Sequence, residues 1–545
     1  MWHPSLLCLL IVWFQIVRAT DRNLLVNTKD TSLFEFYQDS FRMNAEPFST
    51  QKDSSIINSD NIYEWTPVVS NITVGEQNSF VFNIDPESTG SGFAPTYEIL
   101  MFLSGNLCST PNNTDGIELR VHYSFDENLM TNTSNGQYEA FKDGFMEALA
   151  ISPIQTSASN TTSKYQNLYV VVQLFNSTTN EPLTDEFLDP SQKDVWDYRL
   201  SISENDLVFQ WDVRSWLDVL DTDHNSALLT TGNVTADAQV FYNYSTYDTS
   251  LYDLYVYSYE DSLKFEDGLS LSLCAIKNGP YLVSSVDSGR VSSSLEEEGL
   301  VIQKSIREGG GNGVSEYFYI TGLNSSTTYA AILTKKIGKS GNLSDVGGVL
   351  FAKQYFTTRD TNTCSLIYDL HFCDGVAYSV PTSSFAYDNK TLIAETYDNI
   401  AEALFANFSK ALQLIPCDAE SDARYSPLRT CDDCSKSYGD WVCAVSIPRC
   451  TTTSSTYYMS RNKTKNRNKY IDIYVQPVSD YYEILPCIDM CHAIVRDCPS
   501  DFGFACPNPQ YTNELLYYSY NYYKKGATLD TCNFIGNVSN LVQVE

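Results

Sequence analysis

The spacing of cysteines in residues 485–507 constrains this chain more than any other feature of the sequence. The stretch reads LPCIDMCHAIVRDCPSDFGFACP, and its prolines are placed to begin and to end a short helix. Cys487, Cys491 and Cys498 recur at i, i+4 and i+11, within roughly 40° of one another on one helical face. Because they point the same way, we expect each to bond a different neighbouring segment. The sequence therefore predicts a helix that is the hub of a disulfide framework.

The count of cysteines supports a protein made in an oxidising compartment. The chain has 15, and removal of an N-terminal segment that contains Cys8 leaves 14, an even number. Cys108 and Cys274 lie outside the last third, so we expect them to pair and to clamp two sandwich domains together, with pairing outside the chain as the alternative. All fourteen are predicted to form disulfides: Cys108, Cys274, Cys364, Cys373, Cys417, Cys431, Cys434, Cys443, Cys450, Cys487, Cys491, Cys498, Cys506 and Cys532.

The CDDC motif of Cys431 and Cys434 has three interpretations. Half a zinc site requires a second half with matching spacing, and neither the other cysteines nor the histidines supply one. A redox role requires a thioredoxin-like βαβ context, which is missing. Structural disulfides are the favoured interpretation.

Residues 1–19 read as a secretory signal peptide, because the apolar run is about 13 residues long and precedes small residues at a cleavage site. An uncleaved anchor is the alternative. Residues 20–58 are a polar leader. No later segment offers 18 uninterrupted apolar residues, so we expect a lumenal or extracellular protein without an anchor of its own.

Acceptor sites for N-glycans are more frequent than the Asn, Ser and Thr content would give by chance. Asn407 is the weakest of them, since it lies near the apolar stripe of a predicted helix over residues 391–415. The predicted sites are Asn71, Asn112, Asn132, Asn160, Asn176, Asn233, Asn243, Asn324, Asn342, Asn389, Asn407, Asn462 and Asn537.

Alternating apolar runs between turn signals predict two antiparallel β-sandwich domains, over residues 59–215 and 230–360. The run LSLSLCAI at 269–276 is one expected strand. The end of the second domain is similar to that of fibronectin type III domains, with Tyr329 either in a tyrosine corner or an ordinary strand residue. Residues 364–535 form a cysteine-rich helical domain. The predicted fold class is therefore mainly β with an α-rich disulfide domain.

Several function classes are disfavoured. The formal charge of −32 repels phosphate and argues against nucleic acid as a partner. Asp221-x-Asp223-x-Asn225 opens like a calcium loop but fails at its sixth and twelfth positions, so a surface turn is expected. Residues 461–469 (RNKTKNRNK) form a basic island, interpreted as an exposed loop, with contact to lipid headgroups or an acidic partner as the alternative. We expect no enzyme, no cofactor and no metal site.

A family resemblance is carried by the hub stretch, WVCAVSIPRCTTTSS (441–455) and the helix before Cys417, which resemble a frizzled-type cysteine-rich domain. With INSDNIYEWTPVVSNIT (57–73) and YRLSISENDLVFQWDVR (198–214), the chain resembles the fungal mating-pheromone-induced-death family from about Ile57 onward. It is also similar to the cysteine-rich extracellular subunit that caps sodium-leak channels.

The resemblance implies a disulfide pairing within the frizzled-like domain. The implied bonds are Cys364–Cys450, Cys373–Cys443, Cys417–Cys498, Cys487–Cys532 and Cys491–Cys506. Cys431 and Cys434 are surplus to this pattern.

The resemblance also implies a function, that of an auxiliary subunit of the stretch-activated, high-affinity calcium channel. Such a subunit is held to a four-repeat pore-forming chain on the extracellular face of the plasma membrane, passes through the endoplasmic reticulum, and supports calcium entry on mating pheromone, stretch and secretory stress. We further expect the acidic surface to enrich calcium ions nearby. The alternative is a secreted or cell-surface glycoprotein that binds lipid or glycan.

Overall fold

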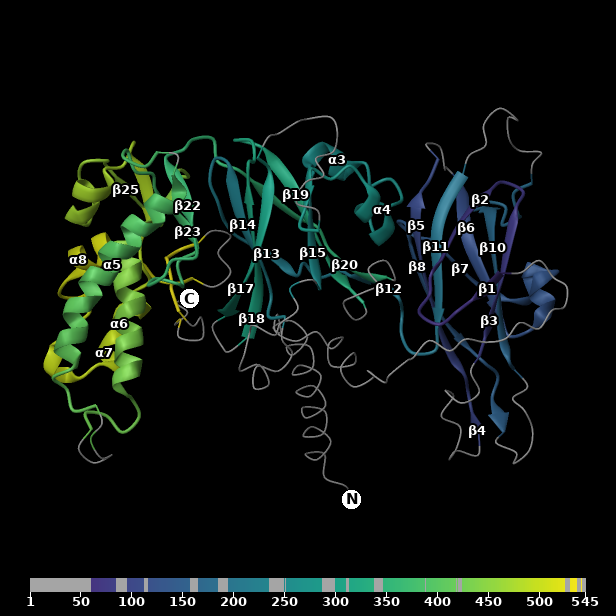
Figure 1. Ribbon diagram of the computed structural model, residues 1–545, viewed down its shortest axis with the longest axis horizontal. Coiled ribbons are helices and arrows are strands. Elements are labelled where there is room, and N and C mark those ends of the chain that lie inside the picture. The colour runs from purple at the N-terminus through teal and green to yellow at the C-terminus, as the bar shows by residue number, and fades with distance from the viewer. Residues whose placement is uncertain are drawn as a thin grey trace, which may run out of the picture. The chain divides into compact units, whose positions relative to one another are not determined.

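The computed structural model describes most of the chain beyond residue 59 (Figure 1). Contacts between residues divide it into two compact units, each built from separate stretches of sequence. Unit 1 is Met1–Trp216, Thr246–Leu295 and Tyr329–Gln354, and unit 2 is Leu217–Ser245, Glu296–Thr328 and Tyr355–Glu545. The described residues are 60–84, 96–111, 116–156, 165–184, 195–234, 249, 251–286, 299–309, 313–337, 347–387, 389–417, 419, 424–524, 530–536 and 541.

The predicted signal peptide (1–19) and polar leader (20–58) lie outside the described residues. The segment predicted as a second sandwich, 230–360, contributes strands to both units. The predicted domain boundaries remain predictions.

Unit 1 contains two sheets that share one core. The first has the strand order β1-β3-β10-β6-β7, and the second has the order β2-β11-β5-β8. The strands of the first are β1 (Asp60–Ile62), β3 (Gln77–Asn83), β10 (Asn167–Asn176), β6 (Ile117–Ser124) and β7 (Gln137–Ala140). Those of the second are β2 (Val68–Thr73), β11 (Val195–Ser203), β5 (Leu100–Ser109) and β8 (Phe145–Ile151). A short pair, β4 (Thr96–Tyr97) and β9 (Gln155–Thr156), is separate, and two 3₁₀ turns, Glu127–Met130 and Thr133–Asn135, follow β6.

Alternation along the strands explains why these two sheets pack face to face. Phe80 and Phe82 on β3 are buried, and so are Trp196, Tyr198 and Leu200 on β11 of the other sheet. Successive side chains of a strand point to opposite faces, so each sheet presents one apolar face. Both faces belong to a single hydrophobic cluster. The two sheets of unit 1 therefore bury their apolar faces in one core.

Unit 1 also holds most of a mixed sheet with the order β12-β20-β19-β15-β16. Its strands are β12 (Phe209–Asp212), β20 (Gly348–Phe351), β19 (Thr328–Lys336), β15 (Tyr252–Ser258) and β16 (Val283–Ser284), with β21 (Gln354–Thr357) paired to β19. The short helices α3 (Tyr259–Leu263) and α4 (Leu273–Asn278) follow β15.

The strand predicted at 269–276 is wrong, because the structure has α4 there. The side chain of Ser272 accepts a hydrogen bond from the amide of Ala275, which is the arrangement of a helix N-cap. Leu273, Cys274, Ala275 and Ile276 are all buried, so the alternation read from the sequence does not separate two faces. The serines of the run therefore act as a helix cap rather than as the outer face of a strand.

Unit 2 contains three sheets. The largest has the order β13-β14-β18-β17, the second pairs β22 with β23, and the third has the order β24-β26-β25. Their strands are β13 (Leu217–Thr222), β14 (Ser226–Thr231), β18 (Gly313–Thr321), β17 (Val301–Gly309), β22 (Cys364–Ile367), β23 (Tyr378–Pro381), β24 (Arg449–Thr451), β26 (Tyr481–Ile484) and β25 (Tyr458–Arg461).

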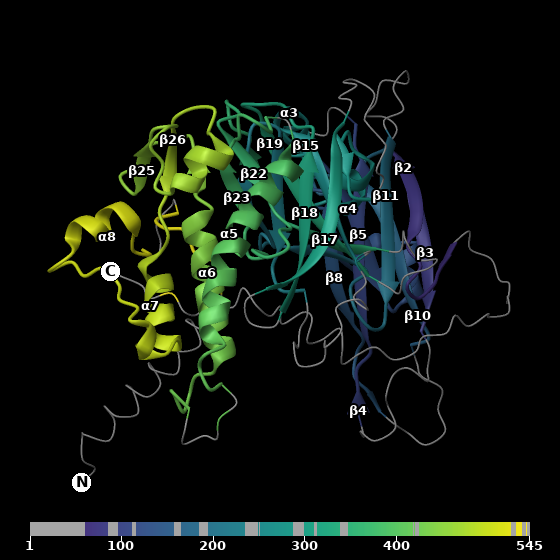
Figure 2. The same ribbon diagram turned by 60° about the vertical axis from the view of Figure 1, so that its left-hand side comes forward.

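The helices of unit 2 are α5 (Lys390–Leu412), α6 (Cys431–Ser446), α7 (Ile488–Asp497) and α8 (Asn513–Ser519), with the short turns Ile471–Val475 and Ser500–Phe502. Helix α6 packs against both α5 and α7 and lies between them in the turned view (Figure 2). The helix predicted at 391–415 is confirmed as α5. Its buried stripe includes Ile393, Tyr397 and Phe408, as the spacing predicted.

Fold class is thus confirmed at the coarser level: the described residues are mostly β, in several largely antiparallel sheets, with disulfides concentrated in the C-terminal part. Among the helices that the structure describes, none is long and apolar enough to cross a bilayer.

Candidate functional site

Helix α7 organises the cysteine-rich part of unit 2. Cys487 is its N-cap residue, Cys491 lies in its second turn and Cys498 is its C-cap residue. These three bond Cys532, Cys506 and Cys434 respectively. The prediction that each reaches a different segment is therefore confirmed. One short helix is tied to three parts of the chain.

All fourteen predicted cysteines are paired in the structure. In unit 1, Cys108 on β5 bonds Cys274 on α4, so the two cysteines do pair with each other. In unit 2 the bonds are Cys364–Cys450, Cys373–Cys443, Cys417–Cys431, Cys434–Cys498, Cys487–Cys532 and Cys491–Cys506. Four of the five bonds that the resemblance implied are among them.

The implied bond between Cys417 and Cys498 is wrong. Thr430 starts α6 with a capping box, which sets Cys431 at the first helical position, next to the chain that arrives from Cys417. Cys434, one turn later, is fully buried, and its Cα lies 4.5 Å from that of Cys498. The two CDDC cysteines therefore join two different structural disulfides, as the favoured interpretation of that motif predicted.

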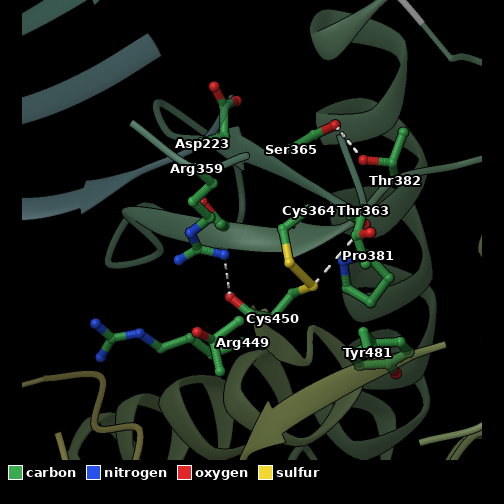
Figure 3. Close-up of a disulfide and its surroundings, with 12 residues drawn as sticks. Asp223, Arg359, Thr363, Cys364, Ser365, Pro381, Thr382, Arg449, Cys450 and Tyr481 are labelled. Atoms are coloured by element: carbon green, nitrogen blue, oxygen red, sulfur yellow. Dashed lines mark hydrogen bonds between the residues drawn. A yellow bond between two sulfur atoms is a disulfide. The ribbon is translucent and has the colours of Figure 1, made fainter. Parts of the chain in front are cut away.

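The Cys364–Cys450 disulfide lies within a network of hydrogen bonds (Figure 3). The Arg359 guanidinium donates to the carbonyl oxygen of Cys450 at 2.9 Å and forms an ion pair with Asp221 at 2.7 Å. The hydroxyl groups of Ser365 on β22 and of Thr382, the residue after β23, are hydrogen-bonded at 2.6 Å. Charged groups thus connect β13 and β24 beside the disulfide that joins β24 to β22.

The turn predicted at Asp221-x-Asp223-x-Asn225 is present between β13 and β14, but its predicted exposure is wrong, because Asp223 is fully buried. Its carboxylate accepts hydrogen bonds from the amides of Leu366 and Ser226 and pairs with Lys390 Nζ at 2.5 Å. Burial alone would raise the pKa of Asp223, but the Lys390 ammonium and the amide donors outweigh it and hold that pKa below its usual value. A lysine occupies the position that a cation would take. Within the described ranges, no group of three or more His, Cys, Asp or Glu side chains is placed to hold a metal.

The basic island at 461–469 divides into two sets of side chains, so its interpretation as one exposed loop is wrong. Arg461 and Arg467 both contact the fully buried carboxylate of Glu483 on β26, at 2.5 and 2.8 Å. A buried carboxylate requires a cation, and the two arginines supply the charge. Lys463, Lys465 and Lys469 are exposed, as predicted; sequence reasoning missed Glu483, which appears as an ordinary strand residue.

Two hollows open on unit 2. The larger, about 580 Å³, is lined by residues of α6, α7, α8 and the basic loop, including Trp441, Ile494, Leu515 and Lys469. We call it the α6–α8 groove. The smaller, about 390 Å³ and more polar, includes Asp440 on α6 with Asp374 and Asp432.

The pKa values of two groups, one in each unit, are shifted in opposite directions. Burial, with Asp374 nearby, raises the pKa of Asp440 to about 6. In unit 1, burial and the Arg120 charge lower the pKa of His122 to about 4. The rings of His122 and Tyr138 lie 5.3 Å apart, with the Arg120 guanidinium 4.7 Å from the Tyr138 ring centre.

Six of the predicted glycan acceptors are exposed: Asn71, Asn132, Asn324, Asn389, Asn407 and Asn462. Asn176 and Asn233 are half-buried, and Asn112, Asn160, Asn243, Asn342 and Asn537 lie outside the described residues. Asn407 is exposed although its place near the apolar stripe made it the weakest candidate. Use of these sites stays a prediction.

Comparison with known families identifies the class of protein. The family model described as a stretch-activated Ca²⁺-permeable channel component matches residues 100–538, which include parts of both units and all seven disulfides. The chain belongs to this family. The stretch-activated cation channel MID1 of Saccharomyces cerevisiae is 62% identical over 494 residues, 90% of this chain and 89% of that protein.

A more distant relative of this channel component matches almost as much of it. The stretch-activated cation channel yam8 of Schizosaccharomyces pombe is 31% identical over 482 residues, 86% of each chain. The MID1 protein of Cryptococcus neoformans is 26% identical over 277 residues, 44% of this chain and 41% of that protein. In this channel component, two disulfides join helices that line the α6–α8 groove to neighbouring parts of the chain.

Proposed function

We propose that the protein is a non-enzymatic, extracellular auxiliary subunit of a plasma-membrane calcium channel. Its frizzled-like cysteine-rich part, residues 364–535, docks on the extracellular loops of a four-repeat pore-forming subunit. The protein associates with the membrane through that partner, after passage through the endoplasmic reticulum. It supports calcium entry on mating pheromone, membrane stretch and secretory-pathway stress.

The observation that carries this proposal is the disulfide-tied block within a chain of this family. Six disulfides lie in unit 2, and four of them have the pairing that the frizzled resemblance implies. Disulfides persist in oxidising compartments, and the exposed acceptor asparagines fit the same location. A block of this kind offers a partner a surface that loses little conformational freedom on binding.

The acidic surface adds a second element to the proposal. A formal charge of −32 attracts divalent cations and would raise the calcium concentration near the mouth of the pore. This enrichment of calcium should weaken as ionic strength rises, because charges further apart than about 8–10 Å are screened at physiological salt. Equal currents with and without this subunit at low external calcium would exclude this role.

The test of the proposed function is purification of the tagged protein from membranes in mild detergent, followed by mass spectrometry of its partners. We expect a four-repeat cation-channel chain in near-equal amount. A protein released without detergent and without such a chain would refute the subunit role.

A lipid- or glycan-binding surface glycoprotein is the second candidate, and the apolar lining of the α6–α8 groove is the observation that favours it. Lipid extracted with the purified protein, or selective retention on cell-wall polysaccharide, would support that function instead.

A further inference from the structure

The α6–α8 groove combines an apolar lining with a basic edge. The apolar surface comes from Trp441 on α6, Ile494 on α7, Leu515 on α8 and Phe504 between α7 and α8. The basic loop contributes Arg467 and Lys469. Its volume of about 580 Å³ lies in the range of about 300–1,000 Å³ that binding pockets have. The groove is large enough for a few side chains of a peptide and too small for a folded domain.

The walls of the groove are held in place before any partner arrives. The Cys434–Cys498 bond joins α6 to the end of α7, and the Cys491–Cys506 bond joins α7 to the loop that follows it. At the end of α8, the Tyr520 hydroxyl accepts a hydrogen bond of 2.8 Å from Trp441 Nε1. A preformed groove avoids the free-energy cost of ordering on binding.

The side chains around the groove are of the kinds found at protein interfaces. Leu515 in its wall is 58% exposed, and Tyr517 and Tyr518 on the same helix are exposed too. Tyr470 and Tyr474, which follow Lys469, are exposed with their rings stacked 6.2 Å apart. Exposed tyrosines beside an apolar pocket are typical of surfaces that bind protein segments, since the rings add contact area and the hydroxyls add hydrogen bonds.

The charge at the edge of the groove selects the occupant. Residues 461–469 contain five basic and no acidic side chains, in a chain of net charge −32. Glu483 neutralises part of this charge through Arg461 and Arg467. Within the part of the chain that the structure describes, the ammonium groups of Lys463, Lys465 and Lys469 form no ion pair. They remain available to an acidic partner.

We propose that the α6–α8 groove binds a single amphipathic segment of the pore-forming subunit. Apolar side chains of that segment enter between Trp441, Ile494 and Leu515, and an acidic side chain beside them meets Lys469. This inference rests on the proposed function and specifies which surface of unit 2 docks and which chemistry the docked segment carries.

The direct test is site-specific photo-crosslinking in cells that express the full-length protein together with the pore-forming subunit. A photoreactive residue replaces Leu515, and the matched control replaces Leu392, an exposed leucine on α5 of the same unit. We expect position 515, and not 392, to crosslink to an extracellular segment of the pore-forming chain that contains apolar and acidic residues. Because Leu515 is largely exposed, the replacement leaves the core intact.

The second arm tests the charge. Lys469→Glu should lower recovery of the pore-forming chain about tenfold, because like charges facing each other across an interface oppose binding. Lys410→Glu, at an exposed lysine of α5, should leave recovery unchanged. Equal secretion of the two variants and the unmodified protein shows that folding is preserved.

The results distinguish failure of the groove proposal from failure of the proposed function on which it rests. If the unmodified protein recovers no pore-forming chain, the proposed function fails. If it recovers that chain but position 515 crosslinks to lipid, to a second copy or to nothing, the groove proposal alone is overturned. Flotation of the purified protein with phosphatidylserine vesicles, if abolished by Lys469→Glu, would likewise overturn it in favour of a membrane surface.

Discussion

The two units stabilise their cores by different means. Unit 1 buries a large apolar cluster between two sheets and has one disulfide. Unit 2 has several smaller clusters, six disulfides and buried carboxylates that are paired with basic side chains. Where apolar burial in a single core is limited, cross-links that restrict the unfolded chain contribute the missing stability.

The difference also concerns geometry. An apolar core tolerates small shifts, whereas a buried ion pair is favourable only when its groups are held at hydrogen-bonding distance. Asp223 with Lys390 and Glu483 with its two arginines hold strands and helices of unit 2 in fixed positions. Unit 1 has such a pair as well, Asp253 with Lys336, but unit 2 combines its ion pairs with six disulfides.

The largest effect should come from reduction of the disulfides. Each native disulfide contributes about 2–5 kcal/mol, so six contribute about 12–30 kcal/mol, which is comparable to or larger than the total stability of about 5–15 kcal/mol of a typical domain. We expect reductant to abolish hydrogen-exchange protection in α5, α6 and α7 while β5, β10 and β11 remain protected. Mass spectrometry of exchanged peptides measures both, with the unreduced protein as control. Equal loss of protection in the two units would remove the distinction between them.

Removing the charge of a buried carboxylate in unit 2 should lower the free energy of unfolding more than removing the charge of an exposed carboxylate in unit 1. Glu483→Gln leaves two arginines without their counter-charge and should lower the free energy of unfolding by about 3–5 kcal/mol. The matched change is Glu118→Gln on β6, whose side chain is 37% exposed beside Arg120 and which should cost about 1 kcal/mol or less.

Denaturant unfolding of both variants, followed by probes in each unit, measures the loss of unfolding free energy that each substitution causes. A Glu483→Gln protein as stable as the Glu118→Gln protein would show that the buried ion pairs are not important for unit 2.

The smallest effects concern pH, and they should have opposite signs in the two units. Asp440 has a pKa of about 6 in the folded protein, above its ordinary 3.8, so between pH 4 and 6 the folded state keeps a proton that the unfolded state has lost. Its contribution to stability therefore falls as pH rises. The pKa of His122 is about 4 in the folded protein instead of the ordinary 6.5, so its contribution to stability rises as pH rises from 4 to 6.5.

Asp440→Asn in unit 2 and His122→Gln in unit 1 should each reduce the change in unfolding free energy between pH 4 and 7 by about 1–2 kcal/mol. This is part of the full linkage energy, which is about 1.4 kcal/mol for a pKa shift of one. The measurement is the unfolding free energy of each unit across pH 4–7, compared with the unmodified protein. Asp501→Asn, at an exposed carboxylate, is the control. The same sign of change in both variants would contradict the assigned environments.

Local patterns predicted local structure well. The prolines and cysteine spacing located α7, and the apolar stripe located α5. Alternation predicted a β-rich region over residues 59–215, in which β3, β6, β10 and β11 lie. Alternation failed at 269–276, where burial on all sides and a serine N-cap produced α4. The Cys417 bond was missed because the start of α6, set by the Thr430 capping box, decides which sulfur faces which neighbour.

The sequence by itself determined most of the elements and the family, since both depend on residue spacing or composition along the chain. Only the tertiary structure decided that Asp223 is buried against Lys390 rather than exposed, that Glu483 pairs with two of the five basic side chains of the island, and that Trp441 and Leu515 line one groove. These residues lie far apart in the chain. Charge pairing and groove shape depend on distances in space, which the spacing of residues along a sequence does not specify.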